Sequence, residues 1–362
     1  MKRLTLFVSL TLLISLNACQ SIPEQPALSP TNTTQSTIAS VTHIDRPTSP
    51  APTPTTLHTS TVTASPTAEK RVTLMAVGDM MLGRTIGELI ESEDYTAPFA
   101  FTAETLADAD ITIGNLECPI STQGKPQDKT YAFRAPLSAA ASLAYGGFDL
   151  VSLANNHILD YGRTALEETL TTLSDNRIQT VGAGLDDVQA YKPVFMDVNG
   201  LKLAFLAFID IPTTDYDYPA WEAAPGKPGV AWGHAQRVKE GVEAAKKQAD
   251  IVIVLVHNGY EIVQKVSSAQ QELAHLAIDS GASLVIGSHP HVLQRIETYQ
   301  DGLIAYSMGN FVFDNFLFPP NYSAILVVEL TPDGVESHQL IDVVVQLNGI
   351  PQIMPYDHSL RP

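Results

Sequence analysis

The sequence is poor in cysteine and in basic residues, and each shortage excludes a class of protein. Only two cysteines, Cys19 and Cys118, occur in 362 residues, so no framework of disulfide bonds can hold the fold together. The chain has 21 Lys and Arg against 39 Asp and Glu, which gives a formal net charge of -18. Sequence-independent binding of nucleic acid needs a basic surface, so we expect no nucleic-acid partner.

Several catalytic motifs are also missing. The chain has no Walker A loop and no Gly-x-Ser-x-Gly elbow, which argues against a P-loop nucleotidase and an α/β-hydrolase. Gly182-Ala183-Gly184 lacks the third glycine of a dinucleotide-binding loop. Cys118 stands beside Glu117, whose carboxylate should keep the thiol protonated, so we do not expect a cysteine nucleophile.

The chain begins with a targeting segment, residues 1–19. Lys2 and Arg3 precede an apolar run that is shorter than the roughly 20 residues of a membrane span, and Ala18-Cys19 closes it. A small residue before a cysteine resembles a lipobox, which implies cleavage before Cys19 and lipidation of Cys19. We therefore expect an extracytoplasmic lipoprotein anchored to a membrane. The alternative is an ordinary cleaved signal with an incidental cysteine.

Residues 20–68 are rich in Ser, Thr and Pro and contain few charged residues. Such a composition cannot bury enough apolar surface to offset the entropy lost on ordering. This stretch is therefore expected to be a disordered tether without a site. We expect the folded domain to occupy residues 69–362.

From Arg71 onward, strand-like apolar runs alternate with amphipathic helical stretches. The expected strands are 72–77, 111–114, 150–153, 194–198, 201–209, 251–256, 284–286, 303–306, 324–330 and 338–345. The expected helices are 138–145, 163–176, 234–248 and 269–280. Asn199-Gly200 between two apolar runs predicts a hairpin. The early and middle parts resemble βαβ units and the last third is antiparallel, so we predict a mixed α/β sandwich.

Polar residues follow five of these strands at the point where each strand ends. They are Gly78-Asp79, Asn115-Leu116-Glu117, Asn155-Asn156-His157, His257 and Gly287-Ser288-His289-Pro290-His291. Open α/β sheets bind ligands beyond the carboxyl ends of their strands, and carboxylate, amide and imidazole groups are metal ligands. Each cluster alone has another explanation, such as an Asx turn at Asp79, a polar loop around Asn156 or a structural role for His257. Their recurrence predicts one shared centre that holds one or two divalent transition-metal ions, Mn, Fe or Zn.

His289 and His291 flank a proline. The residue before a proline favours extended geometry, and side chains i and i+2 of an extended segment leave on the same side. We therefore expect an extended backbone here, with both imidazoles directed at one point. A hydrogen-bonded turn without a metal is the alternative.

The order of these motifs resembles the CapA family, which are capsule synthesis proteins linked to poly-γ-glutamate. The likeness covers about residues 71–318, as Gly-Asp, Asn-Leu-Glu, Asn-Asn-His-Ile-Leu-Asp-Tyr-Gly, His-x-Gly-x-Glu, His-Pro-His-Val and Tyr-Ser-Met-Gly-Asn-Phe-Val-Phe-Asp. It implies a four-layer α/β/β/α sandwich of the metallophosphatase type, with the site at the carboxyl edge of the sheets. It also implies a role in the synthesis or export of poly-γ-glutamate, with that polymer or capsule synthase subunits as partners.

The resemblance also implies roles for individual residues. The implied metal ligands are Asp79, Glu117, Asn156, His257, His289 and His291. His157 is implied to face the leaving group or the developing oxyanion, and Asp160 to orient it. Two departures leave the occupancy of a second metal position open. Met81 stands where metallophosphatases usually have a histidine, and Glu117 stands where they usually have a bridging aspartate.

Other residues are candidates for substrate binding. Arg84 and Arg134 could hold an anionic group, because a guanidinium suits phosphate and carboxylate, or they could be surface residues in ion pairs. The aromatic loop 212–233 could form a lid or a packed Ω-loop.

Two functions remain open. One is a metal-dependent hydrolase or transferase acting at phosphorus or an acyl carbon, which we favour. The other is an accessory protein whose metal site shapes a binding surface for polyglutamate or a partner protein. An acidic domain attracts a polyanion poorly without bound cations, which weakens the second interpretation. Met81 in place of a histidine weakens the assumption of an ordinary phosphatase.

The lipid anchor can be tested by one substitution. Cys19→Ser removes the thiol that would carry the lipid, so the variant should move from the membrane fraction to the soluble fraction. Cell fractionation measures this change. A variant that stays in the membrane fraction like the parent protein would show that the anchor hypothesis is wrong.

Overall fold

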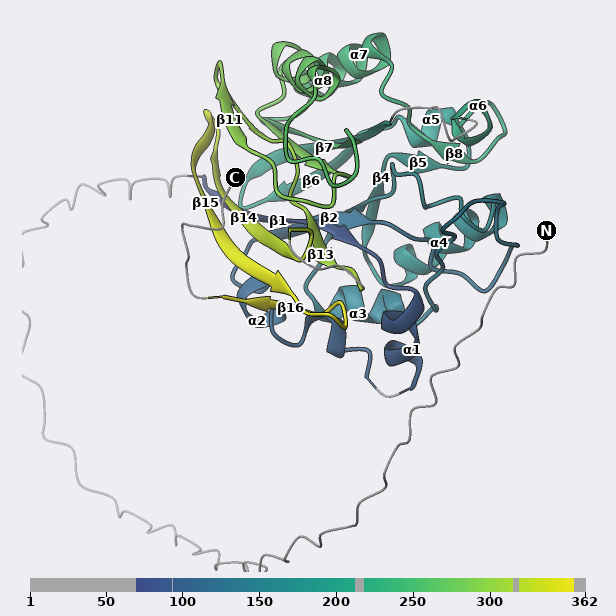
Figure 1. Cartoon of the computed structure of the whole chain (residues 1–362). Coiled ribbons are helices and arrows are strands. Elements are labelled where there is room, and N and C mark those ends of the chain that lie inside the picture. Colours follow the sequence, from purple (N-terminus) through teal and green to yellow (C-terminus); the bar gives the residue numbers. More distant parts are fainter. Residues whose placement is uncertain (1–69, 93, 212–217, 315–318, 355–362) are drawn as a thin grey trace, which may run out of the picture. The chain divides into compact units, whose positions relative to one another are not determined.

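Two β-sheets make up most of the computed structural model of the protein, which describes residues 70–92, 94–211, 218–314 and 319–354 (Figure 1). All of these residues belong to one compact unit, Ala64–Pro362. The segments predicted as signal and tether, 1–19 and 20–68, lie outside the described residues. Among the described residues, no helix is both long enough and apolar enough to cross a membrane.

The first sheet has eight strands in the order β16-β15-β14-β1-β2-β3-β4, and β13 pairs with β1. Its strands are β1 (Val72–Met80), β2 (Ile111–Leu116), β3 (Leu150–Ser152), β4 (Gln179–Val181), β13 (Asn310–Val312), β14 (Tyr322–Thr331), β15 (Gly334–Val345) and β16 (Pro351–Ile353). Strands β1 to β4 run parallel to one another, and β14 to β16 continue the sheet in antiparallel fashion.

The second sheet has six strands in the order β11-β12-β10-β9-β7-β6. Its strands are β6 (Val194–Val198), β7 (Leu201–Asp210), β9 (Ile251–Asn258), β10 (Leu284–Ser288), β11 (Ile296–Tyr299) and β12 (Gly302–Ala305). Its four central strands are parallel, and β6 and β11 are antiparallel edges. A separate two-stranded sheet pairs β5 (Ala183–Gly184) with β8 (Gly229–Val230).

The helices are α1 (Arg84–Ser92), the 3-10 helix η1 (Ala97–Phe99), α2 (Ala103–Leu106), α3 (Ala139–Tyr145), α4 (Arg163–Asp175), α5 (Asp187–Ala190), α6 (Tyr218–Trp221), α7 (Ala235–Lys246) and α8 (Ser268–Asp279). Most of them cover the outer faces of the two large sheets, whereas α5 packs on β5 and β8. Figure 1 shows α7 and α8 above the six-stranded sheet and α1 to α3 below the eight-stranded sheet. The predicted α/β/β/α sandwich is therefore confirmed.

Alternation along the central strands explains this layering. In β9, Ile251, Ile253 and Leu255 join the core between the two sheets, whereas Val252 and Val254 join the core under α7 and α8. A strand that is buried on both faces reads as an unbroken apolar run, because each of its side chains meets either the other sheet or a helix. This is why the apolar runs of the sequence located the strands well.

The predicted helices and most predicted strands are confirmed within a few residues. The hairpin at Asn199-Gly200 is confirmed too, because both residues have positive φ, 49° and 80°, as a tight turn between β6 and β7 requires. The sequence prediction missed the helix α1 and the shorter elements, among them the strands β4, β11, β13 and β16 and the helices α2, α5 and α6.

A close approach between two glycines fixes the edge at which the parallel strands end. A Cβ atom on Gly78 would lie 1.9 Å from the carbonyl oxygen of Gly309. The backbone N–H of Asp79 donates to that same oxygen at 2.9 Å. Because Gly309 precedes β13, this contact sets β13 beside β1, with Asn310 opposite Asp79.

We expect Gly78→Ala to destabilise the fold by about 3 kcal/mol, because the added methyl group meets a backbone atom that cannot rotate away. Gly147→Ala is the matched control. Gly147 has a φ of 78° and no atom within 4 Å of a built Cβ, so only the left-handed backbone is penalised there, by about 1–2 kcal/mol. Denaturant unfolding followed by fluorescence gives both values. Equal losses would contradict the close approach.

Candidate metal centre

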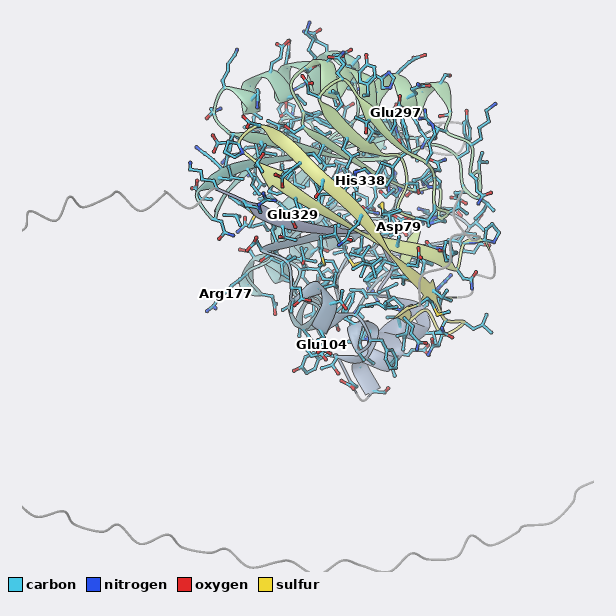
Figure 2. All side chains as sticks on the ribbon, turned by 90° about the vertical axis from the view of Figure 1, so that its left-hand side faces the viewer. Asp79, Glu104, Arg177, Glu297, Glu329 and His338 are labelled. Carbon is cyan, nitrogen blue, oxygen red and sulfur yellow. The ribbon has the colours of Figure 1, made fainter. Side chains whose placement is uncertain are left out.

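Polar side chains from both sheets gather at the carboxyl ends of the parallel strands. Asp79 lies in β1, Glu117 follows β2, Asn156 follows β3, His257 lies in β9, and two histidines follow β10. These six side chains are Asp79, Glu117, Asn156, His257, His289 and His291, and none is more than 5% exposed. Figure 2 shows Asp79 among packed side chains, whereas Arg177 extends to the surface. The structure thus brings all six predicted ligands to one buried place.

Asp79 is held as a carboxylate. Its Oδ1 accepts a hydrogen bond from Asn115 Nδ2 at 2.8 Å, and its Oδ2 accepts one from the backbone N–H of His289 at 3.2 Å. His291 Nδ1 lies 3.2 Å from Oδ2. Burial opposes ionisation, but the hydrogen bond and positive charge of His291 outweigh it and lower the pKa of Asp79.

Glu117 has the opposite tendency. Burial, followed by the charge of Asp79, raises the pKa of Glu117 well above its usual value. Two carboxylates that share a buried site cannot both ionise easily unless a cation compensates them. A positive ion beside Glu117 would therefore remove the cost of its charge.

The surroundings of one Glu117 oxygen, Oε1, show whether a metal ion fits the centre. Oε1 is buried and has no hydrogen-bond partner among the described residues. It lies 3.6 Å from His291 Nε2 and 4.0 Å from His257 Nε2, which belong to two of the predicted ligands. These distances are too long for hydrogen bonds. Donor atoms that each lie about 2.0–2.2 Å from one ion are about 3–4 Å apart, so this spacing fits a shared metal ion.

Neighbouring residues orient the imidazoles. Asn310 Nδ2 donates to the Pro320 carbonyl at 3.2 Å, so its Oδ1 faces His291 Nδ1 at 2.9 Å and accepts from it. Nδ1 of His291 therefore carries a hydrogen, and Nε2 is directed at Glu117. An outer partner that fixes one imidazole nitrogen in this way is typical of metal-ligating histidines.

His257 is oriented in a similar way. Its Nδ1 lies 2.9 Å from Ser288 Oγ, and its Nε2 lies 2.9 Å from Asn156 Oδ1. Burial and the charge of His289 lower the pKa of His257 well below its usual value, which keeps the ring neutral. Burial and the charge of His291 lower the pKa of His289 to about 3. Neutral imidazoles are the form that binds metals.

The backbone of the His289-Pro290-His291 loop corrects the sequence prediction. An extended backbone was expected, but His289 has a φ of 96° and His291 a φ of 56°, so both are left-handed. The rings still approach, with centroids 6.0 Å apart. Tertiary contacts impose this rare geometry, because the His289 N–H is bound by Asp79 and the Pro290 carbonyl accepts from the Ile262 N–H at 2.8 Å.

His157 lies beside the ligands with its ring fixed by a carboxylate. Its Nδ1 is 2.7 Å from Asp160 Oδ2, and Lys129 Nζ donates to Asp160 Oδ1 at 2.7 Å. The ring stacks on Phe133, whose backbone N–H also donates to Asp160 at 2.7 Å. Burial lowers the pKa of His157 although Asp160 opposes the shift. The contact with Asp160 has the geometry that orients the ring, and the catalytic roles of both residues stay predictions.

The two arginines lie at the edge of a pocket of about 580 Å³. Arg84 forms an ion pair with Asp314, and its guanidinium lies 4.9 Å from the centroid of the Phe133 ring. Arg134 stacks on Tyr161 at 4.2 Å and donates to backbone carbonyls of residues 122 and 123. The ion-pair interpretation thus describes Arg84 in this structure, and substrate binding by either arginine stays a prediction.

Three other expectations concern residues around the centre. Burial, more than the Glu117 carboxylate, raises the pKa of the Cys118 thiol to about 12, so the thiol is protonated as expected. Met81 is fully buried, and its sulfur accepts from the Gly83 N–H at 3.2 Å. In the loop 212–233, residues 212–217 lie outside the described residues. Trp232 is buried, and the Trp221 ring lies 5.1 Å from Lys129 Nζ.

Sequence reasoning missed several residues that the structure places here. They are Asn115, Lys129, Glu261, Asn310 and Asp314. Four of them lie inside motifs of the resemblance, and Asn115 and Glu261 share a motif with a predicted ligand, so position within a motif was the available signal. Lys129 lies in a polar loop after β2, and no local pattern marks it.

Together these features define an α/β/β/α sandwich with a candidate metal centre at the carboxyl edge of its sheets. The chain belongs to the family described as bacterial capsule synthesis protein PGA_cap, whose model matches residues 73–315. The predicted family is thus confirmed.

Two relatives from Bacillus agree with this assignment. The chain is 31% identical over 283 residues to the capsule biosynthesis protein CapA of Bacillus anthracis, covering 76% of this chain and 67% of that protein. It is 33% identical over 261 residues to the PGA biosynthesis protein CapA of Bacillus subtilis, covering 71% and 67%. A hypothetical protein from Thermus thermophilus has a similar structure, with a TM-score of 0.49, 16% identity and coverage of 75% and 98%.

Metal binding should stabilise the protein, because the folded state holds the donors together and the unfolded state does not. With Mn²⁺ at 100 times its dissociation constant, the free energy of unfolding should rise by about 2.7 kcal/mol. Elemental analysis and thermal unfolding with and without a chelator measure this. His291→Ala should lose both the metal and the stabilisation.

His338→Ala is the matched control, because His338 is exposed on β15, away from the donors. It should bind metal like the parent protein. Absence of stoichiometric metal in the parent protein, together with no thermal shift on adding metal, would contradict the centre.

Proposed function

We propose that this protein acts in poly-γ-glutamate capsule synthesis as a metal-dependent hydrolase or transferase. Membership of the capsule synthesis family and the names of its Bacillus relatives support the process. The observation that carries the catalytic part is the buried Glu117 Oε1. It lacks a hydrogen-bond partner among the described residues and has three imidazole nitrogens around it, one of them from His157.

The chain supplies the binding groups and the proton carrier. The groups that would hold the ions are Asp79, Glu117, Asn156, His257, His289 and His291. One or two divalent ions, Mn, Fe or Zn, would supply Lewis-acid activation of a phosphoryl or acyl centre. The six donors are buried, so little water surrounds them, and the electrostatic attraction between an ion and its ligands is stronger there than in water.

His157 is the group that would move a proton. Asp160 accepts from its Nδ1, so the exchangeable position is Nε2, which lies 3.9 Å from Glu117 Oε1. Lys129 Nζ donates to the other oxygen of Asp160 at 2.7 Å and to the backbone carbonyl of Asn156 at 2.9 Å. These bonds fix His157 and Asp160 beside the loop that carries Asn156. A proton can thus be delivered to, or taken from, a group bound at the centre.

The substrate class follows from charge. The chain carries a net charge of -18, so an anionic polymer would be repelled unless bound cations attract it locally. The metal centre is where such cations would be held. We therefore propose a γ-glutamyl or phosphoester substrate, with poly-γ-glutamate or capsule synthase subunits as partners.

We also propose that the protein acts outside the cytoplasm. Residues 1–69 are not among the described ones, so this part rests on the lipobox-like Ala18-Cys19 and the composition of 20–68. A lipid on Cys19 and a flexible tether would hold the domain at a membrane where the capsule polymer emerges.

His157→Ala tests catalysis, because this residue is proposed to move a proton and not to bind metal. The variant should keep its metal and its fold and should lower turnover of a phosphoester or γ-glutamyl substrate by roughly 10²–10⁴-fold, the usual contribution of a positioned proton donor. Metal analysis, thermal unfolding and capsule production are the measurements. If His157→Ala supports full capsule production and His289→Ala does not, the centre shapes a binding surface and is not catalytic.

A further inference from the structure

Glu261 is a carboxylate that the proposed mechanism does not use, although it lies at the centre. We propose that Glu261 is a further metal ligand, which closes the exposed side of the centre together with His289 and His291. This inference rests on the metal centre of the proposed function and adds a ligand to it.

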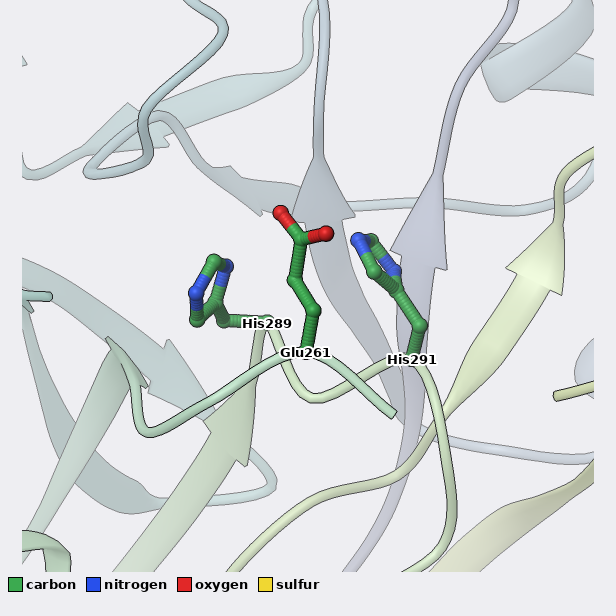
Figure 3. A group of neighbouring side chains, drawn as sticks. All are labelled: Glu261, His289 and His291. Atoms are coloured by element: carbon green, nitrogen blue, oxygen red, sulfur yellow. The ribbon is translucent and has the colours of Figure 1, made fainter. Parts of the chain in front are cut away.

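The three side chains converge. One donor atom from each of Glu261, His289 and His291 lies within 4.8 Å of the others. Figure 3 shows the Glu261 carboxylate between the two imidazoles. Glu261 is exposed, whereas both histidines are buried, so the carboxylate approaches from the solvent side.

His289 supplies a second, independent observation. It is 5% exposed, and its Nδ1 is buried without a hydrogen-bond partner among the described residues. A buried nitrogen that has lost its water and gained no partner destabilises the folded protein. Its neighbours in this group are a carboxylate and another imidazole, and a cation bound among the three would satisfy all of them.

The loop that carries Glu261 is built to hold this position. Ile262 has a φ of 61°, which is rare for a β-branched residue, and its N–H donates to the Pro290 carbonyl at 2.8 Å. Gln294 Nε2 donates to the Val263 carbonyl at 2.8 Å. Gly259 has a φ of 106°, and a Cβ there would lie 2.6 Å from Gln270. These contacts tie the loop to the His289-Pro290-His291 segment on one side and to α8 on the other.

The number of donor atoms that metal ions need explains why Glu261 would be a ligand. The other candidate group, Asp79, Glu117 and His291, belongs to the six buried donors described above. A transition-metal ion in a protein usually needs about four to six donors, so a centre that holds two ions has a place for a seventh ligand. His291 belongs to both groups, so Glu261 reaches the side of the centre that the buried residues leave open. An added carboxylate also favours Mn²⁺ over metals that prefer nitrogen donors.

Glu261→Gln tests the proposal, because it keeps the shape and removes the charge. Titration of the full chain with Mn²⁺ should show affinity at least about 10-fold weaker, since even outer partners of metal ligands contribute that much. The visible spectrum of the Co²⁺-loaded protein should change as well, because a ligand is lost. Glu261→Asp should recover part of the affinity.

Glu272→Gln is the matched control. Glu272 is an exposed acidic residue on α8 outside the cluster, so its loss changes net charge equally. Thermal unfolding in chelator should give the same stability for both variants and the parent protein, which separates loss of metal from loss of fold.

The outcomes separate the two proposals. Equal Mn²⁺ affinity and an unchanged Co²⁺ spectrum in Glu261→Gln, with metal still bound by the parent protein, overturn Glu261 as a ligand and leave the proposed function standing. An affinity loss equal to that of Glu272→Gln also overturns it, as a general effect of charge. A parent protein that binds no divalent ion overturns both proposals.

Discussion

Asp79 and Glu117 are two carboxylates that the fold holds fully buried beside each other, joined through Asn115, which donates to both. Removing two charges from water at one place is costly, and the cost falls only if positive charge is brought to them. The fold brings histidines from the second sheet for this purpose. His291 Nδ1 lies 3.2 Å from Asp79, whereas the nearest imidazole nitrogen to Glu117 that a described residue offers lies 3.6 Å away, and burial still raises the pKa of Glu117. The arrangement is therefore incomplete without a cation, and a metal ion fits that need better than a proton.

The two-sheet architecture follows from the same requirement. Ligands from β1, β2 and β3 of one sheet meet ligands from β9 and β10 of the other, so neither sheet could form the centre alone. A mixed core of alternating side chains fixes the separation of the sheets, and close-packed interiors resist change in that spacing. The glycine contact between Gly78 and Gly309 then sets the end of β1, and with it Asp79, against the loop that leads to β13. The positions of the side chains at the centre are thus set by packing elsewhere in the fold.

Much of this could be predicted from the sequence. Unbroken apolar runs located the doubly buried strands, polar residues at the strand ends predicted a shared metal centre, and the family resemblance implied the six ligands. What failed depends on contacts between distant segments. Proline chemistry predicted an extended loop, but Asp79 and Ile262 hold His289 and His291 in left-handed backbone. The short β13 shows no strand pattern, because it is set by pairing with β1, so the orienting role of Asn310 could not be read from its neighbours.

The residues that were missed share a physical trait. Lys129, Glu261 and Asp314 come from loops, and each acts through a partner far away in the sequence: Asp160 for Lys129, the two histidines for Glu261, and Arg84 for Asp314. Local patterns report burial and periodicity, and neither property marks a loop residue whose position is set by tertiary contacts. The candidate centre therefore combines two kinds of residue. Strand ends place the buried side chains that the sequence indicates, and loops place charged side chains beside them through contacts between distant segments.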